Sequence, residues 1–399
     1  MSTPEHPTSD TSTPAPSVAA NVEPFRPLDA TRALATIAIV ALHAATPYVR
    51  SDLPHLLWPV AERSPWLWQD WLFWSVRGFA RGYLFLVAGL ASAVVIRKVG
   101  ASAFVRKRLQ RIGLPLLVGT ALILPVMYVV WSCGWVVRGW ALPKDIVNFR
   151  FHGRGIQKEL YGFAHLWFLY YLLLTSLVYA GWHAWMPKLR LPDRVRELLA
   201  RSPLRAIVIA APVAVVVGVM PEAIFDFKNG FLPRLDFLAY HLPFFIVGVW
   251  MAGNAPRPPS ASRRWAVELL LAAAVLVVMM PLIRRQSWGP LETADRWLLA
   301  SMVGLYGGLM ASGLAGWASG THAPTERRWQ FLTRHSFWIY LWHLPFVGLV
   351  QIALYGLPVP IVLKVVLSFI AGIAGGIWMS KRLGASRLGW AWGERRQNR

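Results

Sequence analysis

The sequence has little of what a soluble, disulfide-stabilised or metal-binding protein needs. It has one cysteine, Cys133, among 399 residues, which excludes a disulfide framework and a cysteine cage around a metal ion. Only 15% of its residues are charged, whereas a soluble domain carries about 25%. It contains neither a glycine-rich phosphate loop nor the His-Glu-x-x-His zinc signature. We therefore predict no metal and no cofactor.

Acidic residues are also scarce, with 19 Asp and Glu against 41 Lys and Arg and a net charge of +22. In a membrane protein such an excess of base orients the helices, so we interpret it as topology and predict no nucleic-acid partner. Residues 1–25 are rich in Pro, Ser and Thr. They lack the basic start and apolar core of a signal peptide, which predicts a disordered tail.

Long apolar runs are what the sequence does contain. Hydrophobic residues make up 56% of the chain, and about 20 apolar residues are enough to cross a bilayer core of about 30 Å. The runs are continuous rather than alternating, which favours helices over a β-barrel. The sequence predicts an all-α polytopic membrane protein in a lipid bilayer, with one membrane domain at 26–380 and a basic tail at 381–399. About ten transmembrane helices are expected, at 30–49, 76–97, 109–131, 164–186, 204–221, 235–253, 265–283, 296–317, 335–355 and 358–380.

Most of the Lys and Arg residues fall on one predicted face, for example in 97–111 and 188–205. Basic loops remain on the cytoplasmic side, so both termini are predicted to be cytoplasmic, which requires an even number of helices. Two longer segments, 51–71 and 138–165, fall on the far face and mix aromatic with polar residues. The tryptophans of the first segment either stack on sugar rings or form an interfacial belt; they are Trp58, Trp66, Trp68 and Trp71.

The first predicted helix carries two ionisable residues, Arg32 and His43, eleven positions apart. At about 100° per residue both side chains project from one helix face, separated by a rise of about 16 Å. Asp29 lies one turn before Arg32 and can pair with it. Ionisable groups inside a membrane usually face a cavity or a partner, although a membrane histidine can also simply bond a neighbouring helix. A guanidinium that binds phosphate, with a base deeper inside, suits a long ligand such as acyl-coenzyme A.

These residues resemble the hallmark of the membrane acyltransferase-3 family. "LDATRALA", at 28–35, is similar to that family's Leu-Asp-x-x-Arg-x-x-Ala opening, and Arg32-x10-His43 matches its first helix. Further matching segments are "RGYLFLVAGL" at 81–90, "RLQRIGLP" at 108–115, "HLWFLYYLLL" at 165–174 and "SFWIYLWHLP" at 336–345. Ala88 stands where the family usually has serine. The forms "HLWFLYYLLL" and "GLPLLVG" look most like the glucan biosynthesis protein C branch, which is similar to enzymes that succinylate periplasmic glucans.

The resemblance implies a multi-pass enzyme of the bacterial inner (plasma) membrane. Such an enzyme moves an acetyl or succinyl group from cytoplasmic acyl-coenzyme A to a hydroxyl of a carbohydrate, such as a glucan, on the far side. His43 would be the catalytic base or the first acceptor of the acyl group, with Asp29 and Arg32 beside it in the catalytic machinery. The residues implied to bind acyl-coenzyme A are Arg32, Arg81, Arg108 and Arg111, and those implied to meet the acceptor are His165, Trp167, Tyr340 and His343.

Other interpretations stay open at this point. Arg108 and Arg111 also fit a purely topological role, Arg81 fits a buried ion pair with Asp29 or Glu268, and Tyr340 with His343 fits a polar pair in the protein core. Histidines and arginines within membrane helices also mark transport paths, so a transporter or flippase is the alternative function. His241 receives no role. Lys364, near the far boundary, is expected to extend its ammonium group to the interface.

Overall fold

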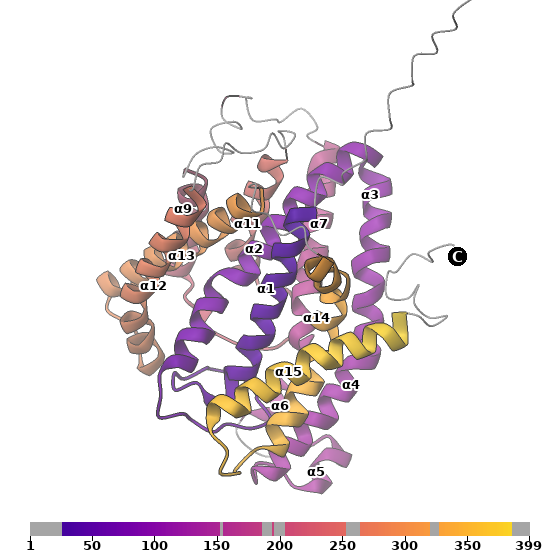
Figure 1. Ribbon diagram of the computed structural model, residues 1–399, viewed down its shortest axis with the longest axis vertical. Coiled ribbons are helices and arrows are strands. Elements are labelled where there is room, and N and C mark those ends of the chain that lie inside the picture. The colour runs from indigo at the N-terminus through magenta and orange to yellow at the C-terminus, as the bar shows by residue number, and fades with distance from the viewer. Residues whose placement is uncertain are drawn as a thin grey trace, which may run out of the picture.

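The computed structural model describes residues 26–151, 155–185, 194, 204–252, 264–319 and 327–384 (Figure 1). Within these ranges the chain is helical and contains no β-strand. Together with the apolar helices described next, this confirms an all-α polytopic membrane protein. The predicted tail at 1–25 and residues 385–399 of the predicted C-terminal tail lie outside the described residues.

Eight helical stretches of the described chain are long and apolar enough to cross a membrane. They contain α1 (Arg26–Ala45), α2 (Trp68–Val99), α3 (Ala101–Arg108) with α4 (Leu114–Val137), α7 (Trp167–Trp185), α12 (Arg264–Trp288), α13 (Thr293–Ser319), α14 (Arg327–Ala353) and α15 (Ile361–Met379). Two shorter apolar helices, α9 (Leu204–Val219) and α11 (Leu235–Met251), cover the other two predicted ranges. The number ten and the cytoplasmic termini stay predictions. Three further α-helices of the described residues are short: α5 (Pro143–Asn148), α6 (Ile156–Glu159) and α10 (Glu222–Phe225). Four 3-10 or π-helical turns lie between or after the α-helices, at Thr46–Tyr48, Leu109–Gly113, Ala164–Leu166 and Ser380–Gly384.

Several helices extend beyond the predicted apolar ranges. Helix α2 begins at Trp68 rather than at residue 76, so Trp68 and Trp71 belong to it. Its first turn carries Asp70, whose carboxylate accepts hydrogen bonds from the backbone N–H groups of Arg50 (3.0 Å) and Ser51 (2.9 Å). Hydropathy could not detect this start, because polar first-turn residues hold the preceding loop instead of facing lipid.

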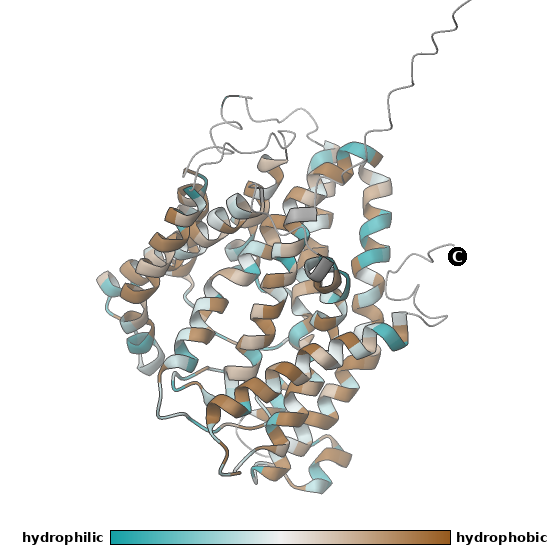
Figure 2. Ribbon diagram, in the orientation of Figure 1, coloured by the Kyte–Doolittle hydropathy of each residue, from teal (hydrophilic) through white to brown (hydrophobic). Residues whose placement is uncertain are grey.

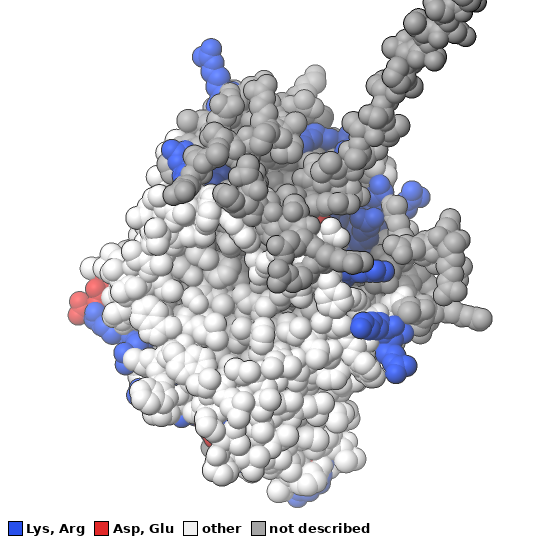
Figure 3. Space-filling model, viewed as in Figure 1, with Lys and Arg blue, Asp and Glu red and all other residues white. Residues whose placement is uncertain are grey.

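The outer surface is suited to lipid. Large hydrophobic side chains are exposed along three helices, for example Leu117 on α4, Leu270 on α12 and Ile370 on α15. Figure 2 shows these helices as largely hydrophobic, while hydrophilic residues gather on α3. Figure 3 shows a broad uncharged area on this face, with Lys and Arg at its margins. Apolar side chains left exposed over such an area face hydrocarbon rather than water.

Helix α2 lies in the interior and crosses α11 with backbone in contact. A Cβ atom at Gly89 would lie 2.0 Å from the carbonyl oxygen of Phe245, and one at Gly248 would lie 2.0 Å from that of Leu86. Only glycine permits this approach from both sides. Small residues at helix crossings are how membrane helices gain van der Waals contact without a hydrophobic driving force.

The two ends of the helix bundle differ. One end, here called the basic end, carries residues 97–111 around the start of α3. The other, here called the loop end, gathers the segments 46–67, 138–163 and 220–234, with α5 and α6 (Figure 1). The Phe227 backbone N–H donates to the Pro54 carbonyl (3.1 Å), and the Asn229 backbone N–H donates to the Glu159 carboxylate (3.0 Å). These bonds join the three segments into one structure.

Lys364 corrects the expectation that it reaches the interface. Its side chain is 0% exposed, and Nζ lies 2.7 and 2.8 Å from the two carboxylate oxygens of Glu62. A buried ammonium group needs a partner, and here that partner lies 302 positions away in the chain. The ion pair therefore fastens the 46–67 segment to α15.

Candidate functional site

The centre of the site is a pair of histidines from α1 and α14. His43 Nδ1 lies 2.9 Å from His343 Nε2, and the two rings stack with centroids 5.0 Å apart. His43 is half-buried, while His343 is fully buried. The pairing brings together the predicted base and a residue that sequence analysis assigned to the acceptor.

The hydrogen bonds of His343 determine the tautomer of His43. His343 Nδ1 lies 3.0 Å from the Ile339 carbonyl and 2.8 Å from the Tyr340 carbonyl, and carbonyls only accept, so Nδ1 carries the proton. A fully buried cation without an acidic partner would be costly, so Nε2 of a neutral His343 must accept. The His43 Nδ1–H group then donates to it. The remaining nitrogen of His43, Nε2, keeps its lone pair and is free to act as a base.

His165 lies beside this pair, and hydrogen bonds to α14 hold it in place. Its Nε2–H donates to the Leu341 carbonyl (2.9 Å), and its ring meets that of His343 edge-on at 5.4 Å. The Tyr340 hydroxyl donates to the His165 carbonyl (2.6 Å). His165 Nδ1 is therefore a buried acceptor, and no partner for it exists among the described residues. It is placed to receive a hydroxyl donor, whereas the Tyr340 hydroxyl is already engaged and positions His165.

Two residues complete the surroundings of His43. Trp58 is buried and stacks on the His43 ring with centroids 5.7 Å apart and an angle of 14° between planes. Gln351 accepts from the Trp58 indole (2.8 Å) and donates to the backbone carbonyls of His43 (3.0 Å) and Ala44 (3.2 Å). Sequence analysis treated Trp58 as one of four similar tryptophans and did not single out Gln351. A glutamine in an apolar helix was the signal that could have identified it.

Arg81 lies in a different part of the interior. Its guanidinium lies 5.4 Å from the ring of Trp167, which also meets His241 at 5.8 Å. The two suggested ion partners were wrong, because Asp29 pairs with Arg32 (3.1 Å) and Glu268 pairs with Arg205 (3.5 Å).

The Arg81 Nε and His241 Nε2 atoms are buried and have no hydrogen-bond partner among the described residues. Sequence analysis assigned no role to His241. The structure nevertheless groups it with two predicted site residues, Arg81 and Trp167.

The remaining predicted residues lie toward the basic end. Arg32 is exposed and paired with Asp29, as its spacing predicted. Arg108 donates to the Ser92 hydroxyl (2.8 Å), and Ser92 in turn donates to the Ala88 carbonyl (2.7 Å). Ser92, one helical turn after Ala88, thus bonds Arg108 of the matching segment 108–115.

Arg111 lies on the π-helical turn Leu109–Gly113 and is exposed. The contacts therefore form three groups of predicted residues, one around His43, one around Trp167 with Arg81, and one at the basic end. No hydrogen bond or ion pair joins them directly within the described chain.

The described residues contain no group of three metal-ligating side chains, and the absence of a metal stays a prediction. What the central cluster offers is acid–base chemistry: an unprotonated nitrogen on His43, oriented by His343, whose ring also meets that of His165 with its buried acceptor nitrogen.

Comparison with known proteins agrees with this chemistry. Residues 26–381 match the family model described as "Acyltransferase domain", that of the acyltransferase-3 family. No curated protein and no solved structure matches the chain. The matched residues contain every helix described above and both histidines of the central pair. The chain therefore belongs to the acyltransferase-3 family and is a multi-pass membrane acyltransferase.

Proposed function

We propose that the protein transfers an acyl group from acyl-coenzyme A, bound from the basic end, to a hydroxyl of a carbohydrate held at the loop end. The observation that carries this proposal is the hydrogen bond between His43 Nδ1 and His343 Nε2, which leaves His43 Nε2 as a base. In this proposal the basic end faces the cytoplasm, following the distribution of Lys and Arg.

In the proposed reaction His43 Nε2 removes the proton of the acceptor hydroxyl. The hydroxyl oxygen attacks the thioester carbonyl, a new C–O bond forms, and the C–S bond breaks. The leaving thiolate takes the proton from His43 Nε2–H, so the ring returns to its starting state. The thioester supplies the driving force and no ATP is consumed. In the alternative route His43 Nε2 itself attacks the thioester, a C–N bond forms and the C–S bond breaks. The acceptor hydroxyl then attacks the acyl-histidine, so that the C–O bond forms, the C–N bond breaks and the hydroxyl proton passes to the thiolate.

The fixed donors and acceptors around His43 support this chemistry. His343 keeps the tautomer that a base requires, as an orienting group does in general. His165 Nδ1 offers an acceptor to a second hydroxyl of the substrate, because the reacting hydroxyl has one proton and gives it to His43. Arg32 and Arg108 provide permanent positive charge at the basic end, where the phosphates of coenzyme A would bind.

The finer identity of the substrates follows from the resemblance of two segments, 113–119 and 165–174, to the glucan biosynthesis protein C branch. We propose succinyl- or acetyl-coenzyme A as donor and a periplasmic glucan as acceptor, in the bacterial inner membrane. The donor and the acceptor are both inferred from motif similarity.

The test uses the full chain in proteoliposomes, with labelled acyl-coenzyme A on one side and a glycan extract on the other. Protease accessibility establishes which way the protein is inserted. We expect thiol release on the donor side and label in the glycan only when the basic end faces the donor. Label transfer with donor and glycan on the same side, or solute flux without thiol release, would overturn the proposal. Comparing succinyl- with acetyl-coenzyme A then identifies the donor.

A further inference from the structure

The loop end contains a cavity of about 590 Å³ that the proposed function has not used. Residues 55–57, Trp140, Gly155, Lys158, Glu159 and Lys228 line it. It therefore lies where the three loop-end segments meet, and it is large enough to hold a sugar unit with its substituents.

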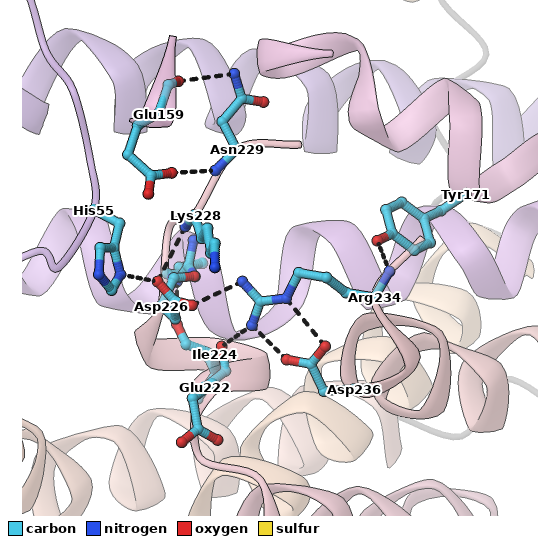
Figure 4. Close-up of polar contacts among 11 residues, drawn as sticks. His55, Glu159, Tyr171, Glu222, Ile224, Asp226, Lys228, Asn229, Arg234 and Asp236 are labelled. Atoms are coloured by element: carbon cyan, nitrogen blue, oxygen red, sulfur yellow. Dashed lines mark hydrogen bonds and ion pairs between the residues drawn. The ribbon is translucent and has the colours of Figure 1, made fainter. Parts of the chain in front are cut away.

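The charges that this cavity presents are mainly positive. Lys158 and Lys228 are both exposed, and neither ammonium group forms an ion pair within the described part of the chain. The guanidinium of Arg138 lies 3.3 Å from the ring centroid of Trp140, which adds a further cation at the aromatic wall. The one acidic lining residue, Glu159, is buried and accepts from the Asn229 backbone N–H (3.0 Å) (Figure 4).

A second carboxylate nearby, Asp226, has a charged partner. Asp226 Oδ1 accepts from His55 Nδ1 (2.7 Å) and from the Lys228 backbone N–H (3.0 Å), and Oδ2 pairs with Arg234 (2.9 Å) (Figure 4). Burial acts to raise the pKa of Asp226, but these hydrogen bonds and the charge of Arg234 hold it below its ordinary value. Asp236 is likewise bound by Arg234, at 2.5 Å. One guanidinium thus serves both aspartates, Glu159 accepts from a backbone N–H, and the two lysines form no ion pair with any of these carboxylates within the described residues.

The backbone at His55 supports a functional use of this wall. His55 has φ of 62°, in the left-handed region that few residues other than glycine adopt. The bond to Asp226 holds it there, and such strain concentrates at sites of binding or catalysis.

Consecutive residues of one segment border the cavity and the catalytic base. Residue 57 lines the cavity, and the next residue, Trp58, stacks on the ring of His43. The Trp131 indole donates to the Leu57 carbonyl (2.8 Å), and the Trp135 indole donates to the Trp58 carbonyl (3.3 Å). These bonds fix the segment between cavity and base.

We propose that this cavity binds the acceptor and that the acceptor is an anionic carbohydrate. A carboxylate or phosphate on the sugar would lie between Lys158 and Lys228, with a ring against Trp140, while a neighbouring hydroxyl points toward His43. The inference rests on the proposed function and deepens it, because it assigns the acceptor a charge. Lysine is a suitable partner for such groups because it presents a compact cation.

The test measures equilibrium binding, so it does not require that the probe be the natural acceptor. The probes are a neutral gluco-oligosaccharide and the same oligosaccharide oxidised at C6 to glucuronate units. Each is titrated into the full chain in zwitterionic nanodiscs, using wild type, the double variant Lys158→Gln/Lys228→Gln, and Lys144→Gln as control. Lys144 is an exposed lysine of α5 at the same end and does not line the cavity.

We expect the oxidised probe to bind wild type and the Lys144 variant more tightly than the neutral probe. The double variant should lose about tenfold in affinity for the oxidised probe and bind the neutral probe unchanged. Equal binding of both probes by wild type, or an unchanged preference in the double variant, would overturn the inference.

The anionic phosphates of coenzyme A are the competing ligand for these lysines. If coenzyme A displaces the oxidised probe competitively, the cavity is a donor site and the inference is wrong. Thiol release from acyl-coenzyme A without any glycan, compared between wild type and a His43 variant, tests the proposed function separately. Intact His43-dependent release with no anion preference would refute only the cavity assignment.

Discussion

Replacing His343 with Phe should remove the group that orients the catalytic base while filling nearly the same volume. The His43 Nδ1–H group then has no acceptor at the position that Nε2 of His343 occupies at 2.9 Å. An unsatisfied buried donor costs about 1–3 kcal/mol, which favours the other tautomer, in which Nε2 carries the proton and cannot act as a base. At about 1.4 kcal/mol per factor of ten, the turnover number should fall about 5- to 150-fold.

The assay is steady-state release of free thiol from acyl-coenzyme A, with kcat and KM measured separately. We expect kcat to fall and KM for acyl-coenzyme A to change little, because the hydrogen bonds of His343 within the described residues go to His43, Ile339 and Tyr340 and not to the arginines of the basic end. His343→Gln should restore part of kcat, since an amide oxygen can accept from His43 Nδ1–H. His335→Phe is the matched control on the same helix, because His335 bonds Ser380 and not His43. A His343→Phe variant with wild-type kcat would refute the assignment of His43 as an oriented base.

Three further predictions concern folding. Glu62→Gln leaves the fully buried ammonium group of Lys364 without its counter-charge, and the free energy of unfolding should fall by about 3 kcal/mol; an unchanged denaturation midpoint would contradict this. Gly89→Leu places side-chain atoms where a Cβ already lies 2.0 Å from a backbone oxygen, so it should destabilise the bundle by about 3 kcal/mol, whereas Gly181→Leu, which faces open space, should melt like wild type. The pKa of Asp226 in the folded protein is lowered from its ordinary value of 3.8. Its ionised form therefore stabilises the fold at pH values above 3.8. This stabilisation is lost as the pH falls through the lowered pKa. Asp226→Asn should therefore lower the melting temperature at neutral pH and flatten its decline in acid; an unchanged acid dependence would show that Asp226 is not responsible.

The fold class was predictable because a helix that crosses lipid must be apolar along most of its length. Continuous apolar runs identify membrane helices, and all ten predicted ranges contain an apolar helix in the described chain. The ends of the helices were harder to predict. Helix α2 starts eight residues early because Asp70 bonds the backbone of a loop, and hydropathy does not register such a bond.

The site was only partly predictable, for a related reason. The spacing of Asp29 and Arg32 predicted their ion pair, because both lie on one helix. The partner of His43 lies 300 positions away, and the Glu62–Lys364 pair spans 302. Contacts of that kind depend on how the helices pack, and one sequence carries no pattern that specifies them. Gln351 was missed because its partners, too, lie far away in the sequence. Its polar side chain within an apolar helix was nevertheless a signal in the sequence.

The most direct test of the account is thiol release from acyl-coenzyme A by His43→Ala beside wild type, with His335→Ala as the folding-matched control. All three proteins are purified as the full chain in nanodiscs, and their melting temperatures are compared first. Loss of a general base should lower kcat by about 10²- to 10⁴-fold, while the control turns over like wild type. Wild-type turnover by a folded His43→Ala protein would contradict the claim that this histidine carries the acyl-transfer chemistry.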